Sequence, residues 1–98
     1  MIRPARPEER QALEDLQRRA SLAHADTRAA LMAHPEAIEL PSGHLARTMV
    51  AAEGNDLLGF AVLLPRDDGD AELDGLFVEP VAWRRGIGAR LVQAAAAA

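Results

Sequence analysis

The sequence predicts an α+β protein, in which helices pack on a mostly antiparallel sheet. Two apolar runs flank the polar turn at residues 54–56, which is typical of a β-hairpin. Apolar residues with helical spacing fill a long segment before this hairpin, and a further strand runs directly into a second helical pattern. The expected order is β-α-α-β-β-β-α over residues 1–98, the length of one small domain.

The first strand and the first helix are expected at the start of the chain. Ile2–Ala5 has the pattern of a short strand. Pro7 suits the beginning of a helix, and acidic residues in the first turn favour its positive end. The segment Glu8–Leu22 is therefore predicted to be an amphipathic helix. Its apolar face consists of Leu13, Leu16 and Ala20.

A second helix is predicted around Leu31 and Met32, and we expect it to end near Pro35. The residues that can cap its start are Asp26 and Thr27. Ile38–Gly43 is expected to be a loop.

The second half of the chain is predicted to supply the rest of the sheet. Arg47–Glu53 alternates as a strand does, and Leu57–Leu64 is its hairpin partner. A polar connection over residues 65–70 leads to the strand Ala71–Val78. From about Arg84 the pattern becomes helical again. The apolar side of this last helix consists of Ile87, Leu91 and Val92.

Composition narrows the function classes. The chain has no cysteine, which excludes disulfides and thiol nucleophiles. No apolar run approaches the roughly 20 residues that span a bilayer, and the start at residues 1–6 has no apolar signal core. We therefore expect a cytoplasmic protein with no membrane partner. The net charge of −4 argues against nucleic acid as the main partner. It would also suit an amine substrate, but solubility is the preferred explanation of the charge.

Isolated polar residues give no catalytic or metal motif. His24, His34 and His44 are spaced 10 apart, which is no ligand spacing, so no metal site is predicted. His44 could line a substrate groove, but a surface position is preferred. Ser21 and Ser42 have no nucleophile motif around them and are interpreted as cap or loop residues.

The junction after the strand Ala71–Val78 carries the strongest functional signal. Arg84 and Arg85 precede Gly86 and Gly88 at the start of the last helix. First-turn N–H groups have no intrahelical acceptor, and glycines let a ligand approach the backbone. Such a site suits a phosphate group, and arginines add charge-assisted hydrogen bonds.

The residues from Leu76 to Pro80, followed after five residues by Gly86–Leu91, resemble the acetyl-coenzyme A motif of bacterial-type GNAT N-acetyltransferases. That signature has Arg or Gln, two residues, Gly, one residue, then Gly or Ala. Gly86 and Gly88 fit it, whereas Trp83 stands where Arg or Gln is usual. Trp83 could stack on adenine, but we expect it to cover the junction.

The resemblance implies a GNAT-like fold, of which this chain would be the first two-thirds, and an acetyl-CoA-dependent N-acetyltransferase. The acetyl group would move to a primary amine of a small molecule, peptide or protein by direct attack, without a metal. Backbone groups of the strand would bind the pantetheine arm, and the helix start would hold the pyrophosphate. The residues implied in cofactor binding are Leu76, Phe77, Val78, Arg84, Arg85, Gly86, Ile87, Gly88 and Ala89.

Direct attack requires a neutral amine, so a base must remove a proton. Glu72 stands where some members of the GNAT family carry a catalytic glutamate, and Asp74 faces the same side of the strand. For Glu72 the catalytic role and a solvent-facing role remain equally open. For Asp74 the solvent-facing role is preferred.

The resemblance also implies that segments common in the family are missing. The chain has no Tyr to protonate the leaving thiolate, and it closes on five alanines that continue a helix. We interpret this as a partial GNAT domain, cut within that helix, rather than as a fraying terminus. An uncovered strand edge would favour pairing with a second chain, including a homodimer. A coenzyme A sensor and a strand-edge protein-binding module remain as alternatives to the enzyme.

Overall fold

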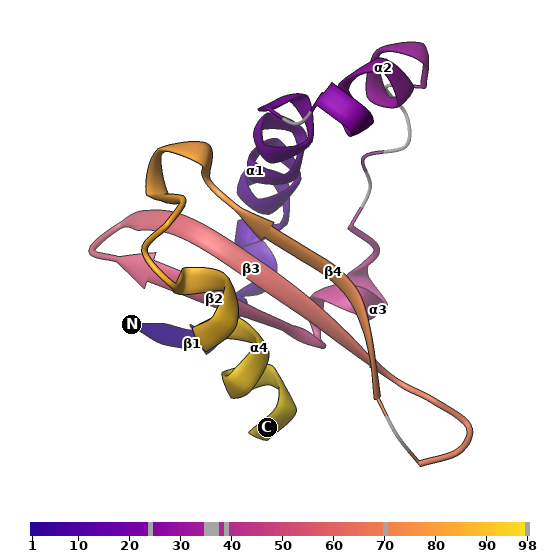
Figure 1. Ribbon diagram of the computed structural model, residues 1–98. Coiled ribbons are helices and arrows are strands. Elements are labelled where there is room, and N and C mark those ends of the chain that lie inside the picture. The colour runs from indigo at the N-terminus through magenta and orange to yellow at the C-terminus, as the bar shows by residue number, and fades with distance from the viewer. Residues whose placement is uncertain (24, 35–37, 39, 70, 98) are drawn as a thin grey trace.

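The computed structural model describes residues 1–23, 25–34, 38, 40–69 and 71–97. Four strands and the predicted helices follow in the expected order (Figure 1), with one further short helix before the hairpin. The strands are β1 (Ile2–Pro4), β2 (Thr48–Glu53), β3 (Asp56–Pro65) and β4 (Ala71–Val78). The α-helices are α1 (Arg10–Ala23), α2 (Ala25–Ala33), α3 (Ser42–Leu45) and α4 (Ile87–Ala97).

The four strands form one antiparallel sheet in the order β1-β2-β3-β4. This confirms the predicted α+β class and the antiparallel sheet. The strand β4 lies at one edge, where its other side faces no strand among the described residues. The sheet therefore presents β4 for contacts with something other than its own described strands.

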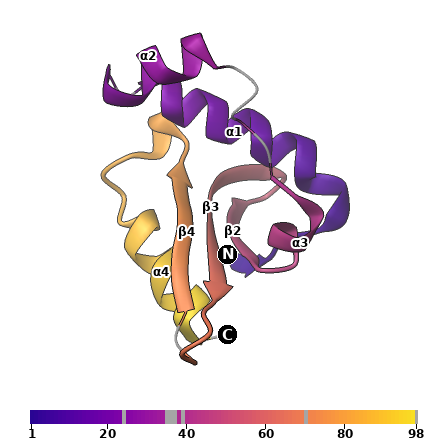
Figure 2. The same cartoon turned by 90° about the vertical axis from the view of Figure 1, so that its right-hand side faces the viewer.

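Helices cover both faces of the sheet (Figure 2), with α4 on one face and α1 and α3 on the other. Alternation in β2 produces this division, because Val50 packs under α1 while Ala51 packs under α4. The α1-side cluster holds Leu13, Leu16, Leu40, Leu45, Val50, Phe60 and Val62. The α4-side cluster holds Ala51, Ala61, Ala82, Ile87 and Leu91.

Several predicted boundaries are corrected. The helix expected from about Arg84 begins at Ile87, because Arg84 and Gly86 have left-handed backbone angles that a helix cannot contain. The loop expected over Ile38–Gly43 gives way to a helix at Ser42. Leu45 in that helix is buried against the α1-side cluster, which explains why the turn forms.

The second helix begins at Ala25, so Asp26 and Thr27 lie inside its first turn and do not precede it. The Thr27 hydroxyl donates a hydrogen bond to the Ser21 carbonyl, which joins the end of α1 to α2. The helix ends at Ala33. His24 and Pro35, the latter predicted near its end, lie outside the described residues.

The start of α1 is joined to β1 by an ion pair. The two terminal guanidinium nitrogens of Arg3, Nη1 and Nη2, lie 2.9 and 2.7 Å from the two Glu9 carboxylate oxygens. Glu9 also accepts a hydrogen bond from the Arg6 N–H at 2.8 Å. The hydrogen bonds from Arg3 lower the pKa of Glu9 to about 2, and the hydrogen bond from the Arg6 N–H makes a smaller contribution.

Within the described residues, no helix has the length and apolar character needed to cross a bilayer.

Candidate active site

The chain leaves β4 through a turn that is fixed to α1. Residues Pro80–Ala82 form one turn of 3₁₀-helix in which Ala82 is buried. Glu79 precedes this turn and forms a bidentate ion pair with Arg19, with nitrogen-to-oxygen distances of 2.7 and 2.8 Å. These hydrogen bonds raise the pKa of the Arg19 guanidinium. The turn therefore leads the chain from the sheet to α4 along a defined path.

Two left-handed residues then direct the chain into α4. Arg84 has φ 68° and Gly86 has φ 72°. The Arg90 N–H donates to the Gly86 carbonyl at 3.3 Å, so the helical hydrogen bonds begin at Gly86. The N–H groups of Gly86, Ile87, Gly88 and Ala89 consequently have no acceptor within the helix. They form the positive end of an 11-residue helix, which suits an anion.

The two glycines of this helix start differ in their surroundings. A Cβ atom at Gly86 would meet nothing within 4 Å, so its requirement is the left-handed angle rather than lack of space. A Cβ atom at Gly88 would lie 3.6 Å from the Leu76 side chain and 3.9 Å from that of Val78. These are ordinary van der Waals distances, so the packing of α4 on β4 has room for a Cβ atom at Gly88.

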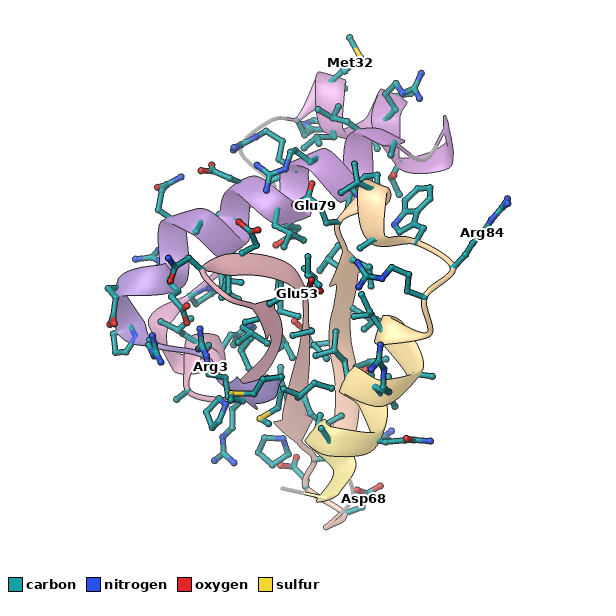
Figure 3. The ribbon with its side chains drawn as sticks, turned by 90° about the vertical axis from the view of Figure 1, so that its left-hand side faces the viewer. Arg3, Met32, Glu53, Asp68, Glu79 and Arg84 are labelled. Atoms are coloured by element: carbon teal, nitrogen blue, oxygen red, sulfur yellow. The ribbon has the colours of Figure 1, made fainter. Side chains whose placement is uncertain are left out.

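The arginines of the junction have separate environments. Arg84 extends away from the protein (Figure 3), and none of the described carboxylates pairs with it. Arg85 pairs with Glu53 at 3.1 Å, which ties the junction to the end of β2. The Arg90 guanidinium donates to the Arg85 carbonyl at 3.2 Å. Positive charge thus gathers around the helix start, where Arg84 and Arg85 are both exposed.

The edge of β4 next to this junction presents regular backbone groups. The Glu79 N–H donates to the Leu58 carbonyl at 2.7 Å, so Glu79 points its backbone groups toward β3. Because neighbouring residues alternate in an antiparallel pair, Phe77 also points toward β3, whereas Leu76 and Val78 point to the free edge. The predicted strand-edge contacts therefore fall on Leu76 and Val78, and Phe77 contributes its ring to the core.

Glu72 and Asp74 lie in the other half of β4. Val62 lies opposite Gly75 and Leu63 lies opposite Leu73, so Asp74 is an extra residue that bulges from β4. Its carboxylate lies 3.6 Å from Nδ1 of His44, the residue assigned above to the surface. Glu72 borders an exposed hollow of about 390 Å³ with Pro65, Arg66, Asp67 and Asp68. Leu76 is four positions further along the strand, a span of about 13 Å.

The described residues contain no group of three or more His, Asp or Glu side chains that could hold a metal ion. The site in these residues therefore consists of backbone donors, arginines and the two separate carboxylates of β4.

Comparison with known proteins identifies the family. The sequence matches the acetyltransferase (GNAT) family over residues 10–98. The chain belongs to the GNAT acetyltransferase family. This confirms the resemblance read from the junction and places this GNAT chain among the transferases. No curated protein matches it.

Solved structures share the GNAT fold. The N-acetylglutamate synthase from Neisseria gonorrhoeae, complexed with coenzyme A and N-acetyl-glutamate, has a TM-score of 0.70 and 23% identity over 96% of this chain. A GNAT family acetyltransferase from Brucella melitensis in complex with acetyl-CoA has a TM-score of 0.66 and 22% identity over 99% of it. A GNAT family acetyltransferase from Bacillus cereus has a TM-score of 0.64 and 15% identity over 96%. This GNAT chain spans 21%, 66% and 60% of those three chains, respectively.

Sequence reasoning missed three contacts of the GNAT junction. They are the Arg19–Glu79 pair, the Arg90 hydrogen bond to Arg85, and a hydrogen bond from the Trp83 indole to Val78. Arg19 and Glu79 are separated by 60 residues, so no local pattern indicates their contact. The sequence came closest for Trp83, which was expected to cover the junction. In the structure its indole has a specific hydrogen-bond partner, the Val78 carbonyl.

Proposed function

We propose that this chain binds acetyl-CoA at the β4–α4 junction, as part of a single GNAT domain to which residues 1–98 contribute. The observation that carries the proposal is the start of α4, where four N–H groups without intrahelical acceptors begin at left-handed Gly86. A pyrophosphate would bind to these groups, from Gly86 to Ala89. Arg84 would add charge, and Arg85 would do so on release from Glu53. The Neisseria and Brucella structures in complex with coenzyme A or acetyl-CoA support this ligand class.

The free edge of β4 would bind the rest of the ligand. The outward Leu76 C=O and Val78 N–H can pair with the amides of an extended arm, as an added strand would. The Leu76 N–H is then the donor available to a thioester carbonyl, a modest oxyanion site. This assigns binding to residues 76–78 and 84–89, with Phe77 holding the strand in place.

The reaction we propose is transfer of the acetyl group to a primary amine. Acetyl-CoA supplies the activated acetyl group, and a neutral amine forms the new N–C bond while the C–S bond breaks. The amine nitrogen loses a proton to a base, and the departing thiolate gains one. We assign the base role to Glu72, acting through a relay of several water molecules, because about 13 Å of strand separates it from Leu76. The acceptor class is a small-molecule or peptide amine.

Thermal denaturation with acetyl-CoA tests the binding. At about a hundredfold excess over Kd, we expect the wild-type Tm to rise by about 10 °C or more. Gly86→Val should remove this rise, because a β-branched residue opposes the left-handed angle at the ligand-binding N–H groups. Gly69→Val is the matched control, since Gly69 has φ 89° at the far end of β4 and also has nothing within 4 Å of its Cβ position.

The two glycine variants separate backbone strain from ligand binding. Both should lower the Tm without ligand, but only Gly69→Val should keep the shift with acetyl-CoA. An unchanged shift in Gly86→Val would exclude the phosphate assignment. Thiol release measured with a panel of amines then separates a transferase from a coenzyme A sensor, which would bind acetyl-CoA without releasing thiol.

A further inference from the structure

Trp83 lies between the two parts of the proposed acetyl-CoA site. It follows the turn at Pro80–Ala82, and its own N–H donates to the Pro80 carbonyl at 3.2 Å. The indole Nε1 donates to the Val78 carbonyl at 2.8 Å, while the residue remains 38% exposed. The side chain is therefore held at the end of β4 by both its backbone and its ring nitrogen.

The indole also forms one wall of a cavity beside the strand edge. This cavity has a volume of about 240 Å³, and β4 contributes Leu76, Phe77 and Val78 to it. The helical side of the cavity is lined by Ala20, Ser21 and Thr27. An extended ligand on the edge of β4 would thus pass directly against the Trp83 ring.

The hydrogen bond from Trp83 limits which edge groups a ligand can use. Of the outward groups of Val78, the carbonyl is already occupied by the indole. The Val78 N–H and the Leu76 carbonyl remain, and these two groups can pair with the C=O and the N–H of two successive amides in an arm that runs parallel to β4. Pairing can therefore not continue beyond Val78 while the indole stays in place.

We infer that Trp83 is a ligand-positioning wall, which ends the pairing edge of β4 at Val78 and turns an extended, amide-bearing ligand toward the N–H groups of Gly86–Ala89. This inference rests on the proposed function and adds a residue at which this chain departs from the GNAT signature. The ligand class is an amide-containing arm joined to a phosphate, in contact with the indole face. Trp83 stays in place when the ligand binds. The ligand can pair with the Leu76 carbonyl and the Val78 N–H, and displacing the indole would break its hydrogen bond to the Val78 carbonyl.

Tryptophan fluorescence tests the inference in the 98-residue chain, because it contains one Trp and no Tyr. Quenching by acrylamide measures access to the indole. We expect acetyl-CoA to reduce the quenching constant about twofold, since its arm would cover the exposed part of the ring. ADP, which carries the pyrophosphate without the arm, should leave the quenching constant unchanged.

Calorimetric titration of Trp83→Phe supplies the second readout. Phe keeps an aromatic ring but cannot donate to the Val78 carbonyl, so acetyl-CoA should bind about fivefold more weakly. Binding of ADP should not change. Val81→Ala is the matched control, because Val81 lies in the same turn and is 90% exposed. It should bind both ligands as the wild type does.

The outcomes separate the inference from the proposed function. If acetyl-CoA binds but quenching stays constant, or if Trp83→Phe binds acetyl-CoA as tightly as the wild type or more tightly, the wall is excluded. Tighter binding would identify the indole as a competitor for the edge. If neither acetyl-CoA nor ADP binds the wild type, the proposed function fails and the inference fails with it. Should Trp83→Phe not fold, the quenching experiment on the wild type decides.

Discussion

The two halves of β4 differ in almost every property that decides what a strand edge can bind. Residues 71–74 are all exposed, carry two carboxylates and contain the bulge at Asp74. Of residues 75–78, Phe77 packs against the α1-side cluster and Val78 against the α4-side cluster, and the backbone groups of Leu76 and Val78 point outward in regular order. Bulges and charges on an edge oppose pairing with a second protein strand. The difference favours a short ligand at the carboxyl-terminal half over a long strand-to-strand interface.

The largest expected effect tests the assignment of chemistry to the exposed half. Glu72→Gln should slow thiol release from acetyl-CoA with an amine about a hundredfold, because the variant cannot accept the amine proton. Asp74→Asn should change it less than about threefold, since Asp74 is placed as a partner of His44. Steady-state thiol release at saturating acetyl-CoA measures both. The reverse ranking would move the base role to the Asp74–His44 pair.

The second prediction compares the stability contributions of the two halves. Phe77→Ala should lower the free energy of unfolding by about 2–4 kcal/mol, because its ring packs against buried Phe60 with centroids 5.3 Å apart. Leu73→Ala should cost less than about 1 kcal/mol, since that residue is 43% exposed. Urea denaturation measures the two changes. Equal losses would mean that the exposed half is also part of the core.

The third prediction concerns the ion pair that anchors the carboxyl-terminal half. Arg19→Ala should destabilise the fold by about 1 kcal/mol, since Glu79 is largely buried but Arg19 is more than half exposed. It should also weaken acetyl-CoA binding severalfold, because the turn that leads to α4 loses its contact with α1. Arg18→Ala is the control, as Arg18 has only a 3.5 Å contact with Asp15 on the exposed face of α1. Identical titrations of the two variants would show that the pair does not position the junction.

The ion pair at the opposite end of α1 should affect folding alone. Because Arg3 lowers the pKa of Glu9 from 4.5 to about 2, ionised Glu9 stabilises the folded state above the ordinary carboxyl pKa. That contribution is lost as the pH falls from about 4.5 through about 2. Glu9→Gln should thus be about 1 kcal/mol less stable than the wild type at pH 7, with the difference vanishing toward pH 2. Urea denaturation along this pH series measures it, and acetyl-CoA affinity at pH 7 should not change.

The sequence predicted those parts of the fold and site that local pattern determines. The alternation over Arg47–Glu53 predicted the strand that forms β2, and the spacing of Gly86 and Gly88 identified the start of α4. The predicted start of that helix, at about Arg84, was too early. Arg84 has a left-handed backbone angle, and arginine is not a residue type that indicates such an angle in a sequence. Local spacing therefore located the junction but not its exact backbone path.

Contacts between distant segments could not be predicted from spacing. The bulge at Asp74 depends on how β4 meets β3, and it shifts the faces on which neighbouring side chains lie. The hydrogen bond of Trp83 to Val78 depends on the turn between them, which reverses the chain over the strand end. These tertiary features decide which edge groups are free, and only the folded chain reveals them.

The smallest expected effect examines how α4 meets the packed half of β4. Gly88→Ala should raise stability by about 0.5–1 kcal/mol, because alanine favours the helix and its methyl group would make ordinary contacts with Leu76 and Val78. Gly59→Ala is the opposite case, since a Cβ there would lie 2.8 Å from the Phe77 carbonyl oxygen. Thermal denaturation of both variants, with and without acetyl-CoA, measures the changes. A loss of acetyl-CoA binding in Gly88→Ala, with stability kept, would show that the ligand needs the space beside this residue, and would bring the helix start and the strand edge into one continuous site.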